Sequence, residues 1–434
     1  MKSMIHEHKR TKGIILSKRI VLVSVILTIF SCQKEKEQVD LIVTYANIYT
    51  VDDSFSKAEA FAVKDGKIIG VGSQKEIESQ YQAPDNRDVD GKTIVPGLID
   101  AHCHFLGLGI NQQAVDLFDT KSYDEVVNRV LDLQNERKNE FILGRGWDQN
   151  DWEDKEFPNK KLLDKLYPNT PIALTRIDGH AILCNQAALD LGKVTVDSKI
   201  EGGEVVIENG ELTGVLVDNA EMLVMNYWPK PSREDAVKAL LDAQDICFDL
   251  GLTTVDDAGL NQESIALIDS LQQSGDLKMR VYAMVSFTTE NLDFYLNKGI
   301  TKTDRLNVRS FKFYADGSLG SRGACLIQPY SDRDSSGERG FMLSTEAHYR
   351  ACAEKLFETG FQMNTHCIGD SANRMILGIY ADVLKGVNDR RWRIEHAQVV
   401  HKIDVPYFGA YSILPSIQPT HATSDMYWAE MRLG

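Results

Sequence analysis

The sequence of 434 residues has little of what marks unstructured, fibrous or disulfide-stapled chains. It contains only 11 Pro and 31 Gly, and 43% of its residues are hydrophobic, so a disordered, collagen-like or low-complexity chain is excluded. The 7 Cys are too sparse for a disulfide scaffold. Positive charge is also scarce: 48 basic and 63 acidic residues give a net charge of −15, which argues against nucleic acid as a partner.

The N-terminus has the features of an export signal. The apolar run Ile20–Phe30 follows two basic residues and is too short to span a bilayer, but it has the length of the apolar region of a secretory signal. Ile29-Phe30-Ser31-Cys32 resembles the lipobox of bacterial lipoproteins, in which the Cys is lipidated after cleavage. We therefore expect a lipoprotein signal peptide over residues 1–31 and a tether over 32–38. A lipid on Cys32 would anchor the exported protein to a bacterial membrane, on the periplasmic or outer-surface side; an ordinary signal peptide or an uncleaved anchor is the alternative.

Short β segments separated by turns fill residues 39–95. An Asp65-Gly66 turn between two apolar segments indicates a β-hairpin. We expect this stretch to form a small β-sandwich segment that precedes a larger domain over residues 96–434.

In the larger domain the pattern alternates between strand and helix, which is typical of a parallel sheet with helical crossovers. Seven candidate strands follow one another: Leu98–Ala101, Thr253–Asp256, Val281–Ser286, Phe311–Tyr314, Gln362–Thr365, Arg393–Glu395 and Ser412–Ile417. Seven such units predict an α/β fold of the TIM type, a (β/α)8 barrel that here lacks strand 8. Because the first two strands are far apart in the sequence, we expect an inserted α/β subdomain at about 120–230.

Histidines lie at the C-terminal ends of several of these strands. His102 and His104 close the first strand, where side chains two residues apart point to the same face. His366 ends the fifth strand, His396 ends the sixth, and Lys312 lies within the fourth. A single His could be a core residue and a Lys in a strand a surface residue. However, the C-terminal strand ends of such barrels converge on one site, so this placement favours a centre for a divalent metal.

The segment Pro96-Gly97-Leu98-Ile99-Asp100-Ala101-His102-Cys103-His104 resembles the opening motif of the amidohydrolase superfamily. That family has His-x-His on strand one, Lys on strand four, His on strands five and six, and Asp on strand eight. The resemblance implies one or two divalent metal ions, with zinc as the expected ion, and a Lys312 that can be carbamylated and act in catalysis. The implied metal ligands are His102, His104, Lys312, His366 and His396.

Four further motifs are similar to those of the amidohydrolase family 3 branch, which includes N-substituted formamide deformylase-like enzymes. They are Gly146-Trp147-Asp148-Gln149, Asp178-Gly179-His180, Asp316–Arg322 and Gln418-Pro419-Thr420-His421. The resemblance implies that His180 and His421 line the pocket and are catalytic candidates, with ordinary polar packing as the alternative for each. It implies a small-molecule substrate and hydrolysis of a C–N bond in an amide, formamide or cyclic amide by a metal-activated hydroxide.

The sequence departs from the family at its end. The family's strand-eight Ser-Asp-x-Pro segment has no counterpart before Gly434, so we expect a chain truncated before that Asp. Asp425 lies in a helical-looking stretch and is not assigned in its place. Two alternatives to an active hydrolase stay open: an inactive, lipid-anchored protein that binds a metal or ligand, and a structural protein with a decayed site. A homo-oligomer is also left open.

Overall fold

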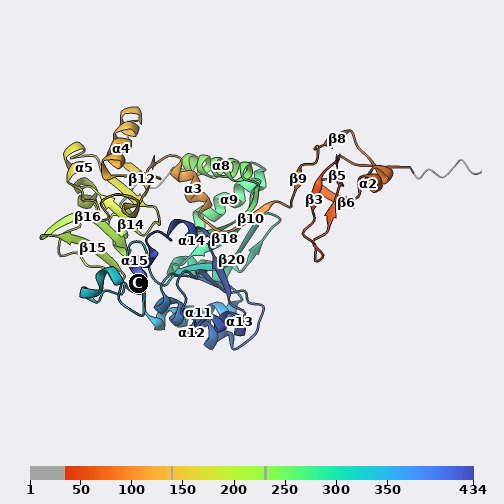
Figure 1. Cartoon of the computed structure of the whole chain (residues 1–434). Coiled ribbons are helices and arrows are strands. Elements are labelled where there is room, and N and C mark those ends of the chain that lie inside the picture. The colour runs from red at the N-terminus through yellow and green to blue at the C-terminus, as the bar shows by residue number, and fades with distance from the viewer. Residues whose placement is uncertain (1–34, 138–139, 229–231) are drawn as a thin grey trace, which may run out of the picture. The chain divides into compact units, whose positions relative to one another are not determined.

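The computed structural model describes residues 35–137, 140–228 and 232–434, which divide into a first unit that ends at Gly97 and a second unit, Leu98–Gly434 (Figure 1). The expected signal peptide and Cys32 lie outside the described residues. Within the described ranges no helix has both the length and the apolar character needed to cross a membrane.

From residue 35 onward, the first unit consists of short strands and the helix α2. Its elements are β1 (Glu37–Gln38), β2 (Leu41–Thr44), β3 (Asn47–Tyr49), β4 (Lys57–Ala58), β5 (Ala60–Lys64), β6 (Lys67–Gly72), α2 (Gln74–Gln80), β7 (Tyr81–Gln82), β8 (Asp85–Asp88) and β9 (Thr93–Ile94). The strands form sheets in the orders β6-β5-β2-β8, β4-β3-β9 and β1-β7. Asp65 and Gly66 both have positive φ, as the tight turn of the β5–β6 hairpin requires.

Apolar side chains cover both faces of the four-stranded sheet. Ile42 lies in one cluster with Ile77 of α2, and Val43 lies in another with Ile48 of β3. Successive strand residues point to opposite faces, so this alternation places the sheet between α2 and the three-stranded sheet. The expected tether differs in one respect: Glu37 and Gln38 form β1, because their backbone pairs with β7.

The second unit is built on a parallel sheet. Its seven parallel strands are β10 (Leu98–Cys103), β17 (Leu252–Leu260), β18 (Arg280–Ser286), β20 (Leu306–Tyr314), β21 (Gln362–Cys367), β22 (Arg393–His396) and β23 (Leu414–Ile417). They are neighbours in that order, and the short β19 (Thr301–Lys302) pairs with β20 in the antiparallel direction. The predicted α/β fold with a parallel, barrel-like sheet is confirmed. That the chain lacks strand 8 stays a prediction.

The sheet is nearly closed, and one side chain spans the opening. In the described residues β10 and β23 are the two ends of the sheet and do not pair with each other. Arg393 of β22 donates from Nη2 to the carbonyl oxygen of Ala101 on β10 (2.5 Å) and to Oγ of Ser416 on β23 (2.8 Å). The predicted last strand began too early, because Ser412 has a φ of 51° and lies in the turn before β23.

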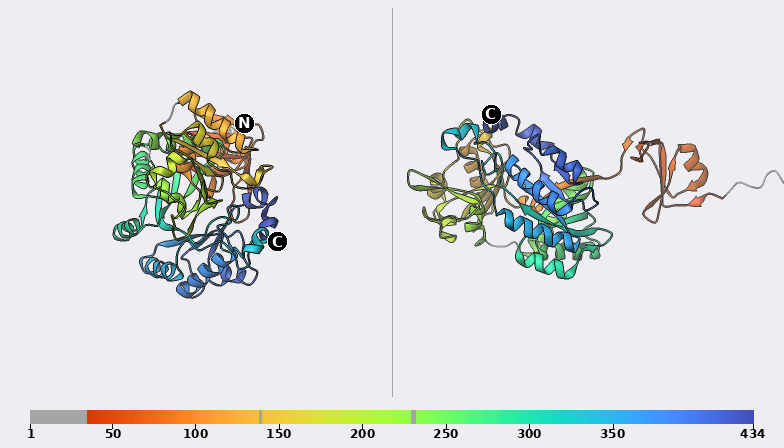
Figure 2. Two further views of the ribbon diagram at one scale, coloured as in Figure 1. Left: turned by 90° about the vertical axis from the view of Figure 1, so that its left-hand side faces the viewer. Right: turned by 90° about the horizontal axis from the view of Figure 1, so that it is seen from below.

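Helices follow the strands and lie along the outer face of the sheet (Figure 2). They are α3 (Phe105–Asn111), α8 (Arg233–Asp249), α9 (Gln262–Ser274), α10 (Thr289–Lys298), α11 (Glu346–Thr359), α12 (Asp370–Leu384) and α13 (Val405–Ala410). Two short helices follow β23 elsewhere: α14 (Thr420–Ser424), and α15 (Ala429–Leu433), whose Arg432 donates to Asn150 of the inserted residues. The main core lies between sheet and helices, where Phe311 and Ile394 pack in one cluster with Ile268, Leu356 and Tyr380.

Between α3 and α8 the chain forms a separate subdomain. Its elements are β11 (Val115–Asp116), α4 (Tyr123–Arg137), β12 (Ile142–Trp147), α5 (Lys161–Leu166), β13 (Ile172–Arg176), β14 (Ala181–Cys184), α6 (Gln186–Leu191), β15 (Gly203–Glu208), β16 (Glu211–Asp218) and α7 (Met222–Met225). The strands form one sheet in the order β11-β12-β13-β14-β16-β15.

Candidate active site

Six imidazole rings gather at the C-terminal end of the barrel strands. Ring centroids are 4.6 Å apart for His102 and His396 and for His366 and His396, 4.9 Å for His180 and His366, 5.7 Å for His396 and His421, and 5.8 Å for His102 and His104. The structure thus brings together every histidine selected from the sequence, from segments as far apart as β10 and α14. We call His102, His104, His180, His366, His396 and His421 the imidazole cluster.

Lys312 lies directly beside this cluster. Its side chain comes from β20 and is only 1% exposed, and its Nζ lies 3.4 Å from Nε2 of His102. In the described part of the chain Lys312 forms no ion pair with a carboxylate. Burial lowers the pKa of its ammonium group to about 8. A buried amine that readily loses its proton is suited to chemical modification rather than to a surface role.

Hydrogen bonds orient two of the rings toward the centre. His102 Nδ1 lies 2.5 Å from Oε2 of the fully buried Glu395, and His396 Nδ1 is bonded to Oε1 of Gln418. An acceptor at Nδ1 selects the tautomer with its proton there and leaves Nε2 free to bind a metal. His396 also has a φ of 72°, so the end of β22 is held in a conformation that non-glycine residues rarely adopt.

A buried ionic chain holds Glu395 in place. Arg393 donates to Glu395 from Nη2 (2.9 Å), and its Nη1 donates to Asp256 of β17 (2.8 Å). Burial alone would raise the pKa of Glu395, but the hydrogen bond to His102 and the charge of Arg393 lower it to about 2. Glu395 therefore remains a carboxylate and a permanent acceptor for His102.

The imidazole rings of His102, His104, His366 and His396, the inner rings of the cluster, are held in the neutral form. Burial, followed by the neighbouring positive charges, lowers the pKa of His366 and of His396 well below the ordinary value, and burial with the charge of Lys312 lowers the pKa of His102. The pKa of His104 is lowered as well, first by loss of water and then by Lys312, His102 and Arg145. Neutral imidazole is the form that binds a metal ion.

A cavity of about 570 Å³ opens beside the cluster. The barrel contributes its wall through His104, Asp257, Tyr314 and others, and the inserted subdomain contributes Arg145, Asp178, His180, Asp218 and Glu221. A cavity of this size between two layers is typical of small-molecule sites. The inserted subdomain therefore forms one side of the candidate active site.

His180 differs from the inner rings because it is paired with an acid. Its Nδ1 lies 2.6 Å from Oδ1 of Asp218, the last residue of β16. Burial opposes its charge, but the hydrogen bond and the charge of Asp218 raise the pKa of His180 to about 9. His180 is therefore protonated near neutral pH, with Nε2 carrying a proton at the cavity.

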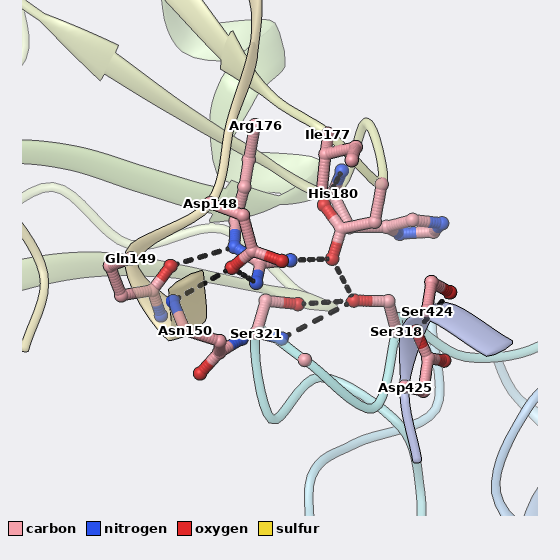
Figure 3. Close-up of polar contacts among 12 residues, drawn as sticks. Asp148, Gln149, Asn150, Arg176, Ile177, His180, Ser318, Ser321, Ser424 and Asp425 are labelled. Carbon is pink, nitrogen blue, oxygen red and sulfur yellow. Dashed lines mark hydrogen bonds and ion pairs between the residues drawn. The ribbon is translucent and has the colours of Figure 1, made fainter. Parts of the chain in front are cut away.

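The loop that carries His180 is held by a buried arginine (Figure 3). Arg176 is 1% exposed, and its guanidinium is bonded to Asp148, to Asp178 and, at 2.9 Å, to Oε1 of Gln149. Asp178 also accepts a hydrogen bond from Oγ of Ser318, in the loop after β20. This cluster joins the inserted subdomain to the barrel at the edge of the cavity.

Two other residues of the sequence motifs, His421 and Trp147, have partners that hold them away from the cavity. His421 does not line the cavity, and both its ring nitrogens have partners, Asp425 at 3.2 Å and Gln418 at 3.1 Å. Trp147 is fully buried and donates from Nε1 to the carbonyl oxygen of Leu174, so it belongs to the core of the subdomain.

Five residues that hold or face these histidines were not predicted from the sequence: Arg145, Asp218, Glu221, Arg393 and Glu395. Arg393 and Glu395 carried a usable signal. Charges two residues apart in an otherwise apolar strand place both on one face, and inside a barrel this indicates a buried network.

The donor set fits a divalent metal chemically. Neutral imidazoles with oriented tautomers and a buried, deprotonatable lysine are suitable ligands for zinc and similar ions. As the side chains lie, no three His, Cys, Asp or Glu residues in the described ranges are arranged to hold one ion. The fit therefore rests on donor chemistry and the shared location.

Comparison with known proteins identifies the family. Residues 86–434 match the amidohydrolase family. The chain belongs to this family. The solved structure of an uncharacterized metal-dependent hydrolase from Pyrococcus horikoshii is similar with a TM-score of 0.70 and 28% identity, covering 91% of this amidohydrolase and 77% of that chain.

Curated proteins are similar over most of the chain. Protein LONG AFTER FAR-RED 3 of Arabidopsis thaliana is 31% identical over 414 residues, covering 91% of this amidohydrolase and 70% of the plant protein. Putative amidohydrolase YtcJ of Bacillus subtilis is 29% identical over 397 residues, with 89% and 74% covered. N-substituted formamide deformylase of Arthrobacter pascens is 28% identical over 386 residues, with 82% and 69% covered. Together with the fold, these findings support a metal-dependent hydrolase of the amidohydrolase family.

Proposed function

We propose that this amidohydrolase hydrolyses C–N bonds of amide, formamide or cyclic amide substrates at the imidazole cluster. The observation that carries the proposal is the gathering of six imidazoles and a buried lysine at the C-terminal strand ends, next to a cavity of about 570 Å³. The names of the formamide deformylase and of the YtcJ amidohydrolase support this reaction class.

In this proposal His102, His104, His366 and His396 hold one or two divalent ions, with zinc as the expected ion. A bound ion of this kind lowers the pKa of a water molecule to about 7 and polarises a carbonyl oxygen. Glu395 and Gln418 keep His102 and His396 in the tautomers that leave Nε2 free. Lys312, when carbamylated, would add an anionic ligand, whereas the unmodified ammonium group would repel a cation.

His180 is the proposed proton donor. Asp218 keeps it protonated through Nδ1, and His180 lines the cavity that would hold the substrate. A C–N bond breaks more easily when the leaving nitrogen receives a proton, and a donor within hydrogen-bond reach supplies it. His421, with both ring nitrogens occupied, would act by keeping Gln418 and thereby His396 in position.

The proposal is tested with the zinc-loaded full chain and a panel of simple amides, formamides and cyclic amides, by measuring the release of amine or carboxylate. His366→Ala should reduce both bound zinc and hydrolysis. His401→Ala, at an exposed histidine of the same barrel, should change neither. Zinc binding without hydrolysis of any substrate class would instead support a metal-binding protein without turnover, and equal zinc content in the two variants would exclude the ligand assignment.

We further propose that the protein is exported and anchored through a lipid on Cys32. The lipobox-like residues Ile29–Cys32 support this, and they lie outside the described residues. Metabolic labelling with a radioactive fatty acid should label the full chain and leave a Cys32→Ser variant unlabelled. Equal labelling of both chains, or labelling of neither, would contradict the anchor.

A further inference from the structure

Arg145 is a cation of the cavity that the mechanism above does not use. It lies on β12 and lines the cavity, where its Nη2 donates to the carbonyl oxygen of Ile177 (3.2 Å). Of the ion pairs found within residues 35–137, 140–228 and 232–434, none involves Arg145. A guanidinium group that faces a cavity without an acidic partner has free donors for a ligand.

Three carboxyl groups of the cavity wall, on Asp178, Asp218 and Asp257, are bonded to groups other than Arg145. Asp178 is bonded to Arg176, and Asp218 is paired with His180. Asp257 accepts a hydrogen bond from the backbone N–H of Leu106 (3.1 Å). In the described residues none of these three carboxyl groups forms an ion pair with the guanidinium group of Arg145.

Glu221 is the fourth acidic residue that lines the cavity. It lies on the short helical turn Asn219–Glu221, and its Oε1 is buried without a hydrogen-bond partner. Burial raises the pKa of Glu221 to about 8, so the neutral acid prevails near neutral pH. Among the described residues Glu221 forms no ion pair with Arg145, and it acts on the guanidinium only through space, as Asp178 does.

A glycine keeps the guanidinium fixed and accessible. Gly179 has a φ of 74°, and a Cβ at this position would lie only 3.1 Å from Nη2 and 3.3 Å from Nη1 of Arg145. A side chain at residue 179 would therefore push the guanidinium out of position. With Ile177 and Gly179 on one side, Arg145 presents its remaining donors to the cavity.

Arg145 faces the same space as the imidazole cluster. It lines the cavity together with His104 and His180, and its charge is one of those that lower the pKa of His104. A planar guanidinium binds a carboxylate through two parallel hydrogen bonds. A single guanidinium carries one positive charge, which matches the single negative charge of a carboxylate better than the double charge of a phosphate.

We propose that Arg145 binds a carboxylate group of the substrate, so that the substrates are amides or formamides that also carry a carboxylate. This inference rests on the proposed function, because it assigns the substrate class of the same site. It makes Arg145 a residue that determines specificity, whereas the imidazole cluster carries the chemistry.

The test compares N-formyl amino acids with their uncharged amides, using the glycine, leucine and phenylalanine derivatives to cover different side-chain sizes. Binding to the zinc-loaded full chain is measured by calorimetry, and formate release is measured in parallel. The variants are Arg145→Gln and Arg145→Lys, with Arg233→Gln, at an exposed position on α8, as the matched control. Circular dichroism and thermal melting establish that each variant is folded.

Wild type and Arg233→Gln should bind the acids about 10- to 100-fold more tightly than the amides, as expected for a charged hydrogen-bonded pair. Arg145→Gln should lose this preference while its affinity for the uncharged amides stays the same, and Arg145→Lys should retain part of it. Equal affinity of wild type for acids and amides, or no binding of either, would overturn the inference, as would a preference for inorganic phosphate over the acids. Because binding is measured separately, a protein that binds the acids but hydrolyses none of the amide, formamide and cyclic amide substrates contradicts the proposed function and leaves the carboxylate site supported.

Discussion

Replacing Arg176 by methionine removes the cation that is bonded directly to two carboxylates, the buried Asp148 and the half-buried Asp178. Arg176 is bonded to Asp148 and Asp178, and its side chain is 1% exposed. Methionine has a similar length, so the change removes charge and hydrogen bonds more than volume. The two carboxylates would then lie beside each other with no cation bonded to either.

The expected loss in the free energy of unfolding follows from the charges of the two carboxylates. Removing one partner of a buried ion pair typically costs roughly 3–5 kcal/mol. The variant can relieve the repulsion by protonating one carboxyl, which at its ordinary pKa of 3.8 costs roughly 4 kcal/mol at about pH 7. Both routes predict a loss of about 3–5 kcal/mol in the free energy of unfolding.

The loss should depend on pH. Without the cation, burial raises the folded-state pKa of Asp148 and Asp178 above the unfolded value, so the folded variant binds a proton more tightly than the unfolded chain. Lowering the pH then stabilises the folded variant relative to its unfolded state. Between about pH 7 and pH 5 the deficit relative to wild type should shrink by up to roughly 2–3 kcal/mol.

Denaturant unfolding of wild type, Arg176→Met and the exposed control Arg233→Met at both pH values tests this reasoning. The control should stay within about 0.5 kcal/mol of wild type. The account of Arg176 fails if Arg176→Met is as stable as the control at neutral pH, or if its deficit is the same at both pH values.

Further predictions concern the cluster itself. Glu395→Gln should weaken zinc binding about 10- to 100-fold, because His102 loses the carboxylate at Nδ1, and unchanged affinity in a chelator competition would contradict this. Lys312→Ala should lose hydrolysis that short-chain carboxylates partly restore, and absence of rescue leaves carbamylation unsupported. Asp218→Asn should lower the pKa of His180 from about 9, measured by NMR titration, and an unshifted titration would show that Asp218 does not hold the proton there.

The barrel strands and the histidines at their ends could be predicted from the sequence because both depend on local patterns. Short apolar runs marked the barrel strands, and the order of parallel strands follows from right-handed crossovers. His102, His366 and His396 each lie at the end of such a run. Because the strand ends of a barrel converge, the sequence predicts that these three side chains lie close together.

The contacts that tune the site could not be predicted in this way. Glu395 and His102 are 293 residues apart, and their pairing depends on how two barrel strands face each other across the interior. Arg145 lies in a strand of the inserted subdomain, and an arginine in a strand usually faces solvent. Only the packing of the subdomain on the barrel shows that its guanidinium faces the cavity.

The central claim is that the imidazole cluster holds a divalent metal. X-ray absorption spectroscopy of the zinc-loaded protein tests it most directly, because the scattering pattern of imidazole distinguishes histidine nitrogen from water and carboxylate oxygen. The account predicts several imidazole ligands at about 2.0–2.1 Å from zinc. A zinc spectrum without imidazole scattering would contradict it.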